Sequence, residues 1–131
     1  MQSALTLKLL EATFGILKLP PTAPFPDWLR DVSPYFVART EDEFSVMCPQ
    51  HVIPSEITYS ADWRCLRVHG ALVFDEVGVA ARLSHPLAGA GLSIFVVSTH
   101  DRDYVFVAEK DLTTALAIYE QNGFLMFGYA S

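Results

Sequence analysis

The sequence is short of the residues that nucleic-acid binding and membrane insertion require. Only 9 of its 131 residues are Lys or Arg, against 15 Asp or Glu, so the formal net charge is −6. Phosphate backbones are bound through basic faces, so this balance argues against a nucleic acid partner. No apolar run approaches the roughly 18 residues that span a bilayer, and the first ten residues lack a secretion-signal pattern. We therefore expect a cytoplasmic protein with no membrane or nucleic acid partner.

Residues for metal binding and nucleophilic catalysis are equally scarce. Cys48 and Cys65 fit no Cys-x-x-Cys pattern, and we interpret them as reduced, buried thiols. The histidines show no metal-binding spacing: His51, His69, His85 and His100. No nucleophile and base can be paired at a plausible spacing. We therefore predict no catalytic residues, no metal site and no cofactor, and hence no enzyme.

Apolar residues are abundant, at 51% of the chain against 18% charged, which is typical of a folded globular protein. The clearest pattern lies between residues 64 and 107. A strand ends at Val68 and a loop follows at 70–76. Apolar residues at helical spacing then predict a helix at 77–88, with one face made of Val79, Ala80, Leu83 and Leu87. The run 94–97 predicts a buried strand, and 104–107 its hairpin partner.

Two further elements complete this half of the chain. Apolar residues from Leu112 to Tyr119 predict a second helix that Gly123 ends, and 124–129 predicts a last strand. The first half is poorer in helix signals. The apolar runs 5–10 and 14–19 predict two strands, and four prolines between Pro20 and Pro26 exclude a helix beyond a single turn at Asp27. A hairpin is predicted at 35–39 and 44–48.

This hairpin matches the later one without a gap. The segment PYFVARTEDEFSVMCPQHVI, from Pro34, aligns with SIFVVSTHDRDYVFVAEKDL, from Ser93, at an offset of 59 residues. The identical pairs are Phe36 with Phe95, Val37 with Val96, Thr40 with Thr99, Asp42 with Asp101 and Val46 with Val105. The agreement of strand, turn and strand favours a duplicated unit, and shared strand propensity is the alternative explanation.

The expected fold is therefore α+β, with two tandem ferredoxin-like halves. The second half, residues 62–131, has the order β-α-β-β-α-β, which gives an antiparallel sheet with helices on one face. The first half, residues 1–61, is a degenerate version, because its proline run stands where the second half has a helix.

The motifs FDEVGV, PLAGAGLSIF and STHDRDYVFV occur in this order between residues 74 and 107. With the β-α-β-β-α-β order, they resemble an ACT domain, the small regulatory fold that binds amino acids. More narrowly, they resemble the ACT subfamily of the CASTOR-type cytosolic arginine sensors, which also includes small bacterial proteins with two ACT-like halves. The resemblance implies an amino-acid-binding regulatory module. The alternative is a module that uses the ACT fold only for assembly.

The resemblance also implies a site. Its residues come from a loop, the start of a strand and a hairpin turn: Phe74, Asp75, Glu76, Val77, Gly78, Ser93, Ile94, Thr99, His100 and Asp103. In the sensors the matching loop wraps the ligand. The glutamate that matches Glu76 meets the ligand's positive end, and the aspartate that matches Asp103 is a second acidic contact. Ser93 and Ile94 contribute from a different ACT domain, and the sensors have four such domains where this chain has two halves. His100 departs from the sensor pattern, in which an aromatic or other residue stands at this position. We therefore expect a homodimer or a higher even oligomer.

Simpler explanations exist for the acidic residues. Asp75 and Glu76 also suit the first turn of a helix, where the helix dipole favours carboxylates. Asp101 suits a turn, since Asp42 repeats it in the first half. Asp103 differs, because Phe44 is its counterpart, and that asymmetry favours a site. Two carboxylates beside a helix start predict a zwitterionic ligand, and a basic amino acid such as arginine over an acidic one.

Overall fold

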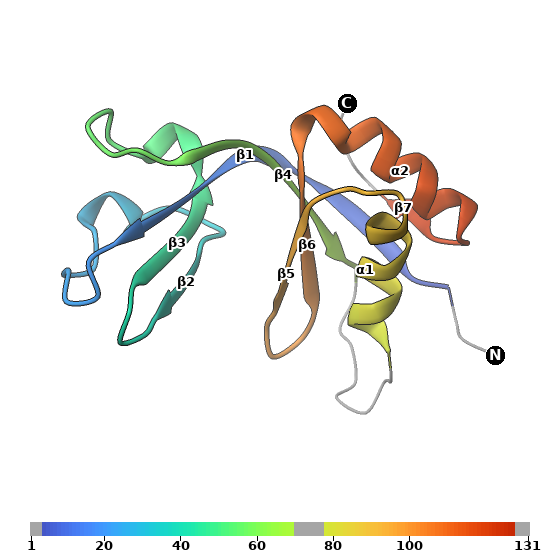
Figure 1. Ribbon diagram of the computed structural model, residues 1–131, viewed down its shortest axis with the longest axis horizontal. Coiled ribbons are helices and arrows are strands. Elements are labelled where there is room, and N and C mark those ends of the chain that lie inside the picture. Colours follow the sequence, from blue (N-terminus) through green and yellow to red (C-terminus); the bar gives the residue numbers. More distant parts are fainter. Residues whose placement is uncertain (1–3, 70–77, 128–131) are drawn as a thin grey trace. The chain divides into compact units, whose positions relative to one another are not determined.

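The computed structural model describes residues 4–69 and 78–127 (Figure 1). The strands are β1 (Thr6–Leu19), β2 (Phe36–Arg39), β3 (Phe44–Pro49), β4 (Ser60–Val68), β5 (Ile94–Ser98), β6 (Asp103–Ala108) and β7 (Leu125–Phe127). The helices are α1 (Val79–Gly89) and α2 (Leu112–Gln121), and the short 3₁₀ helices are η1 (Asp27–Leu29), η2 (Gln50–Val52) and η3 (Glu109–Asp111). No helix among the described residues is long and apolar enough to cross a membrane.

The chain forms two compact units. The C-terminal unit comprises residues 1–11 and 64–131, and the N-terminal unit comprises residues 12–63. Strands β1 and β4 run through the boundary and contribute residues to both units. The division into contiguous halves at residues 61 and 62 therefore stays a prediction, and each unit as observed includes part of β1.

The C-terminal unit confirms the predicted β-α-β-β-α-β order, which runs β4, α1, β5, β6, α2, β7. Its strands lie in the order β1-β4-β6-β5, with β5 and β6 antiparallel. The last strand, β7, pairs in parallel with β1 from Thr6 to Lys8. The N-terminal strand thus completes the sheet of the C-terminal unit.

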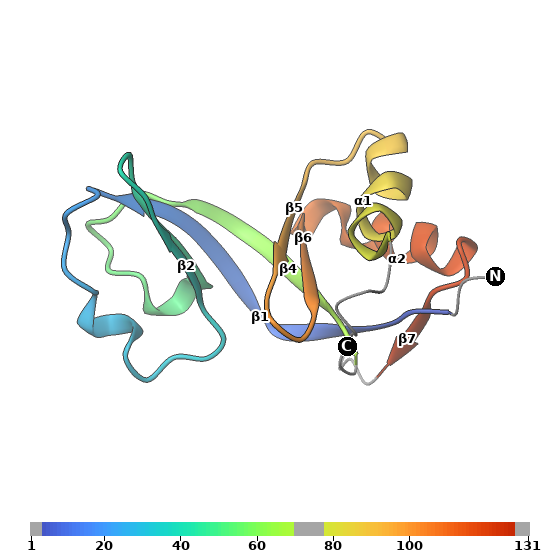
Figure 2. The same ribbon diagram turned by 90° about the horizontal axis from the view of Figure 1, so that it is seen from below.

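Both helices pack on one face of this sheet, as predicted (Figure 2). Side chains alternate between the faces of a strand, and Leu66, Val68, Val105 and Val107 share the face that the helices cover. The helix residues in the same core are Val79, Leu83, Leu87, Ala115 and Tyr119. The prediction was wrong for Ala80, which is exposed, because buried residues of α1 recur every four positions from Val79.

The two helices are also joined by a buried hydrogen bond. The Tyr119 hydroxyl of α2 donates to the Leu83 carbonyl of α1 at 2.6 Å, and burial raises the pKa of this phenol. Each helix ends near a glycine with positive φ, Gly91 at 79° and Gly123 at 85°, where a side chain would be strained. Gly123 therefore stops α2 as predicted, whereas Gly89 is the last residue of α1 and Gly91 lies just beyond it.

Strand β1 corrects the first-half prediction. It is one strand of 14 residues, not two strands separated at 11–13. Glu11 and Thr13 are polar, but the segment between the two apolar runs contains neither Gly nor Pro, so nothing forces a turn there.

The N-terminal unit pairs β1 with β3 and β3 with β2, both antiparallel. Its core contains Leu17, Leu29, Phe44, Val46, Cys48 and Ile53. The proline segment forms turns and then the single 3₁₀ turn η1, which confirms that no helix runs through it.

The two predicted hairpins have the same geometry at the same offset of 59 residues. Phe36 faces Met47 in one, and Phe95 faces Phe106 in the other. A backbone hydrogen bond closes each turn. The Thr40 N–H donates to the Glu43 carbonyl, and the Thr99 N–H donates to the Arg102 carbonyl, both at 2.9 Å. A 3₁₀ helix comes after each hairpin, again 59 residues apart. This agreement in register supports a duplicated unit.

Strand β5 differs from the prediction of a buried strand. It lies at the end of the strand order, paired to β6, and Phe95 is 41% exposed. An unbroken apolar run is expected where both faces are covered, but β5 is the last strand in the order and, among the described strands, pairs only with β6.

Gly15 gives a stability prediction. A Cβ at this position would lie 2.7 Å from both Ile53 Cδ1 and Tyr59 Cδ2. We expect Gly15→Ala to lower the free energy of unfolding in urea by about 1–3 kcal/mol, because the neighbours must move. Gly89→Ala is the control, since nothing lies within 4 Å of its Cβ, and it should be neutral or stabilising. Equal stability of the two variants would contradict this view of Gly15.

Candidate functional site

One end of the C-terminal unit gathers several residues of the predicted site. Helix α1 leads directly into β5, so the start of α1 and the far end of β5 lie at the same end of the unit (Figure 1). Gly78 precedes α1 at this end, and the β5–β6 turn contains Thr99 and His100. Asp103 begins β6 there, opposite Ser98. The structure thus brings Gly78, Thr99, His100 and Asp103 to one end.

Asp103 is the buried acid of this end, with 9% of its surface exposed. It shares a strand face with Val105 and Val107, which pack with α1 in the core. Its carboxylate therefore belongs to the face that α1 covers, at the end where α1 begins. Within the described residues, no hydrogen bond or ion pair involves this carboxylate.

The neighbouring acid, Asp101, is in a different environment. It is exposed and accepts a hydrogen bond from the exposed His100 ring at 2.7 Å. That bond, with the charges of His100 and Arg102, lowers the pKa of the Asp101 carboxyl. Thr99 closes the turn with its hydroxyl, which donates to the Arg102 carbonyl at 3.0 Å. Asp101 and Thr99 thus have turn contacts, whereas Asp103 has a buried position.

Gly78 stands at the start of α1 with φ at 80°, a left-handed conformation that favours glycine. Its carbonyl accepts the Arg82 N–H at 2.9 Å, and so it begins the helix hydrogen bonds. The first N–H groups of a helix lack partners within the helix and favour an anion such as a carboxylate. Phe74, Asp75, Glu76 and Val77, predicted to wrap the ligand, lie outside the described residues.

Ser93 and Ile94 lie at the other end of β5. Ile94 faces Val107, whereas Ser98 faces Asp103, four residues further along the strand. At about 3.3 Å per residue, that separation is roughly 13 Å, so one small ligand cannot touch both ends in one chain. Ser93 and Ile94 can join the predicted site only from a second ACT domain, as the resemblance implied.

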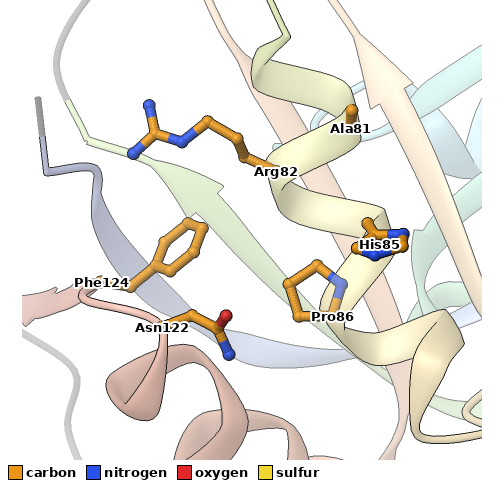
Figure 3. Close-up of a pocket in the computed structure, with 6 residues that line it drawn as sticks. All are labelled: Ala81, Arg82, His85, Pro86, Asn122 and Phe124. Carbon is orange, nitrogen blue, oxygen red and sulfur yellow. The ribbon is translucent and has the colours of Figure 1, made fainter. Parts of the chain in front are cut away.

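A pocket of about 480 Å³ lies elsewhere in this unit, between α1 and the end of α2 (Figure 3). Its lining residues are Ala81, Arg82, His85, Pro86, Asn122 and Phe124. The Arg82 guanidinium lies 5.9 Å from the centre of the Phe124 ring. Sequence reasoning missed this pocket, because its residues come from the outer face of one helix and the turn after another.

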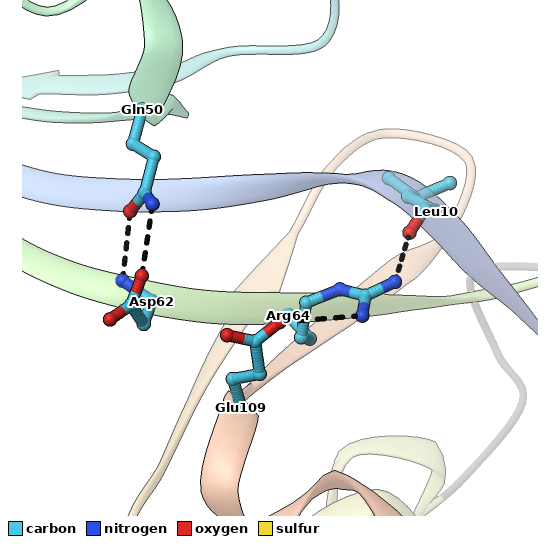
Figure 4. A network of polar contacts seen from close by, with 5 residues as sticks. All are labelled: Leu10, Gln50, Asp62, Arg64 and Glu109. Atoms are coloured by element: carbon cyan, nitrogen blue, oxygen red, sulfur yellow. Dashed lines mark hydrogen bonds and ion pairs between the residues drawn. The ribbon is translucent and has the colours of Figure 1, made fainter.

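Each unit also has a polar contact between the first residue of a 3₁₀ helix and β4 (Figure 4). In the N-terminal unit, Gln50 donates to the Asp62 carboxylate at 2.9 Å and accepts the Asp62 N–H at 2.8 Å. In the C-terminal unit, Arg64 donates to the Leu10 carbonyl at 3.2 Å and lies 3.8 Å from Glu109. Gln50 and Glu109 are again 59 residues apart, and Arg64 forms an ion pair with Glu109.

The thiols and the metal-binding residue types offer no reactive centre among residues 4–69 and 78–127. Cys48 and Cys65 are free and buried. Burial raises the pKa of Cys48 to about 11 and raises the pKa of Cys65 as well. A thiolate is the nucleophilic form, so these groups are unreactive near neutral pH. The described part of the chain contains no cluster of three His, Cys, Asp or Glu that could hold a metal ion.

Comparison with known families gives two matches. The family model of an ACT domain matches residues 58–120, which include β4, α1, β5, β6 and most of α2. A second model, of an N-terminal domain, matches residues 12–56, within the N-terminal unit.

Among characterised proteins, the human cytosolic arginine sensor for mTORC1 subunit 1 is 30% identical over 77 residues. The match covers 55% of this chain and 23% of the sensor, so the chain spans less than a quarter of that relative's length. The bovine sensor matches to the same extent.

Among solved structures, a protein from Agobacterium tumefaciens has a TM-score of 0.91 and 29% identity, with 99% of this chain and 96% of that chain covered. The regulatory subunit of aspartate kinase from Thermus thermophilus has a TM-score of 0.57 and 16% identity, with 88% and 93% covered. The second likeness shows the fold.

Thiol reactivity tests the burial of the cysteines. We expect neither thiol to react appreciably with a disulfide reagent at pH 8 in the native protein, because both are buried and protonated. Both should react once urea unfolds the chain. Cys48→Ala assigns the remaining signal to Cys65, and fast labelling of either thiol in the native state would contradict the assignment.

Proposed function

We propose, since the family model of an ACT domain matches residues 58–120, that this protein is a regulatory module that binds an amino acid and catalyses no reaction. The module would act in the cytoplasm. The observation that carries the proposal is the buried Asp103 at the end of the unit where α1 begins. The 77-residue similarity to a cytosolic arginine sensor supports an amino acid as ligand.

The charges at this end favour a zwitterion. Backbone N–H groups at the start of α1 would take the α-carboxylate, because their donors are unpaired within the helix and the helix dipole is positive there. Asp103 would take a cationic group, with Glu76 as a second carboxylate. An acidic side chain would bring a third negative charge to these carboxylates, so we propose a basic amino acid such as arginine in preference to an acidic one.

The complete site would require two chains. Ser93 and Ile94 lie at the end of β5 that is remote from Asp103, so a partner must supply them. Among the described strands β5 pairs only with β6, and its Phe95 is 41% exposed, which suits pairing with a second copy. A homodimer formed through the β5 edge is therefore part of the proposal.

The alternative is an ACT module that assembles through β5 without a ligand. The exposed Phe95 on β5 supports assembly as well as it supports a shared sensor site, because assembly through β5 requires no ligand contact at Asp103. Ligand binding distinguishes the two functions, since only the sensor requires it.

Amino acid binding is the first test. We expect a thermal-shift screen of the amino acids to show stabilisation by L-arginine, about 2.7 kcal/mol at 100 times its Kd. Calorimetry should then show arginine affinity falling about 10- to 150-fold in Asp103→Asn, because a charged hydrogen bond of about 1.5–3 kcal/mol is lost. Glu76→Gln would test the second carboxylate in the same way.

Asp101→Asn is the matched control for Asp103→Asn. It removes a carboxylate two residues away that is exposed and bound to His100, so arginine affinity should not change. No shift with any amino acid would favour the assembly function. Unchanged affinity in both Glu76 and Asp103 variants would make these carboxylates turn and cap residues only.

Oligomeric state is the second test. We expect light scattering at micromolar concentration to show a dimer, and Phe95→Lys to shift it to the monomer, because a lysine on an edge strand opposes pairing. Val37→Lys is the control, since Val37 is 42% exposed on the edge strand β2 of the other unit. A monomeric wild-type protein that still binds arginine would contradict the shared site.

A further inference from the structure

The N-terminal unit contains an arginine at the position that matches the end of the candidate site. At the offset of 59 residues, Arg39 corresponds to Ser98, and Phe44 corresponds to Asp103. These residues face each other across their hairpins in both units. The proline segment after β1 also corresponds in chain order to the loop after β4, since each begins the connection from a long strand to the hairpin. Arg39 thus lies where the second half of the chain would receive its ligand.

The Arg39 guanidinium is held from three directions. One terminal nitrogen donates to the Pro21 carbonyl at 2.5 Å, and the other donates to the Ala23 carbonyl at 2.8 Å. The guanidinium carbon lies 4.0 Å from the centre of the Phe44 ring, a cation–π contact. A planar fork with two donors on neighbouring carbonyls and an aromatic face beneath it is a complete binding arrangement for a guanidinium.

The proline segment creates the need for these donors. In a helix each carbonyl accepts from the N–H group four residues later, but the four prolines between Pro20 and Pro26 prevent a helix here, so its carbonyls lack those partners. Within the segment, Ala23 N–H donates to the Pro20 carbonyl at 2.9 Å. The Pro21 and Ala23 carbonyls instead accept from Arg39, a residue 18 and 16 positions away in sequence. A segment that cannot form a helix is therefore held by a cationic side chain.

We propose that Arg39 is an internal ligand, whose guanidinium occupies in the N-terminal unit the place that a cationic ligand takes in the C-terminal unit. This inference rests on the proposed function, since it compares Arg39 with the ligand proposed for the C-terminal unit. It assigns positions 44 and 103 the same task, cation recognition, performed by a ring face in one unit and by a buried carboxylate in the other. With Arg39 in this place, the N-terminal unit is expected to take no cationic ligand there.

Chemical complementation tests the proposal. Arg39→Ala removes the side chain beyond Cβ, and ethylguanidinium supplies the missing atoms. Arg39 is exposed as a residue, so the probe can reach the site from solvent. We expect Arg39→Ala to melt a few degrees below the wild type, and low millimolar ethylguanidinium to restore the melting temperature saturably. Ethylammonium at the same concentration should not restore it, because its nitrogen corresponds to Nε and it lacks the two terminal nitrogens of the planar fork that reach the Pro21 and Ala23 carbonyls.

Arg30→Ala is the matched control within the same unit. Arg30 is exposed and pairs with the exposed Asp27 at 2.8 Å, without carbonyl or ring contacts in that ion pair. Any stabilisation of the wild type and of Arg30→Ala by ethylguanidinium would come from binding at Asp103, so the proposal requires a further rise in melting temperature that is confined to Arg39→Ala. An equal response of all three proteins, or none in Arg39→Ala, would overturn the proposal.

A measurement on the wild-type protein covers the case in which Arg39→Ala fails to fold. We expect the side-chain NMR signals of Arg39 to show slow rotation of the guanidinium and an upfield ring-current shift from Phe44, with Arg30 as the mobile reference. An Arg39 as mobile as Arg30 would overturn the proposal. Arginine binding to the wild type tests the proposed function, and ethylguanidinium complementation of Arg39→Ala tests the role of Arg39. The two proposals can therefore fail independently.

Discussion

The 14-residue strand β1 is the constraint on which both units depend. Its first part supplies Leu7 and Leu9 to the core of the C-terminal unit, and its second part supplies Leu17 to the core of the other. It also forms the partner of β7 in one unit and of β3 in the other. Because neither core is complete without this strand, the units cannot be separated by cutting the chain at a midpoint.

The two hairpins share one backbone geometry but carry different side chains. Register, threonine-closed turn and the 3₁₀ helix after the hairpin agree at the offset of 59 residues, so the backbone is common to both units. The units differ between the long strand and the hairpin, because prolines exclude a helix in one and α1 forms in the other. The residue at the start of the second hairpin strand also differs between the units: it is Phe44 in the N-terminal unit and Asp103 in the C-terminal unit.

Sequence patterns predicted the helices, both hairpins and the α+β class, because burial at helical or alternating spacing is a local property. They failed at β1, where polar Glu11 and Thr13 suggested a break, and at β5, where an apolar run does not reveal that the strand lies last in the order. Of the predicted site, Gly78 and Asp103 lie at one end of a unit, whereas Ile94 lies at the other. The Arg39 contacts were not predictable, because a guanidinium that reaches carbonyls 16 and 18 residues away leaves no spacing signal.

The burial of Asp103 connects the fold to the ligand. A buried carboxylate costs free energy unless a cation or hydrogen-bond donors compensate it. In the N-terminal unit the matching position is apolar, and the cation of that region, Arg39, is covalently part of the chain. In the C-terminal unit the matching residue is Asp103, a mostly buried acid on the core face at the end where α1 begins. A cationic ligand that compensates this carboxylate would stabilise the folded unit on binding, which is the physical requirement for a sensor.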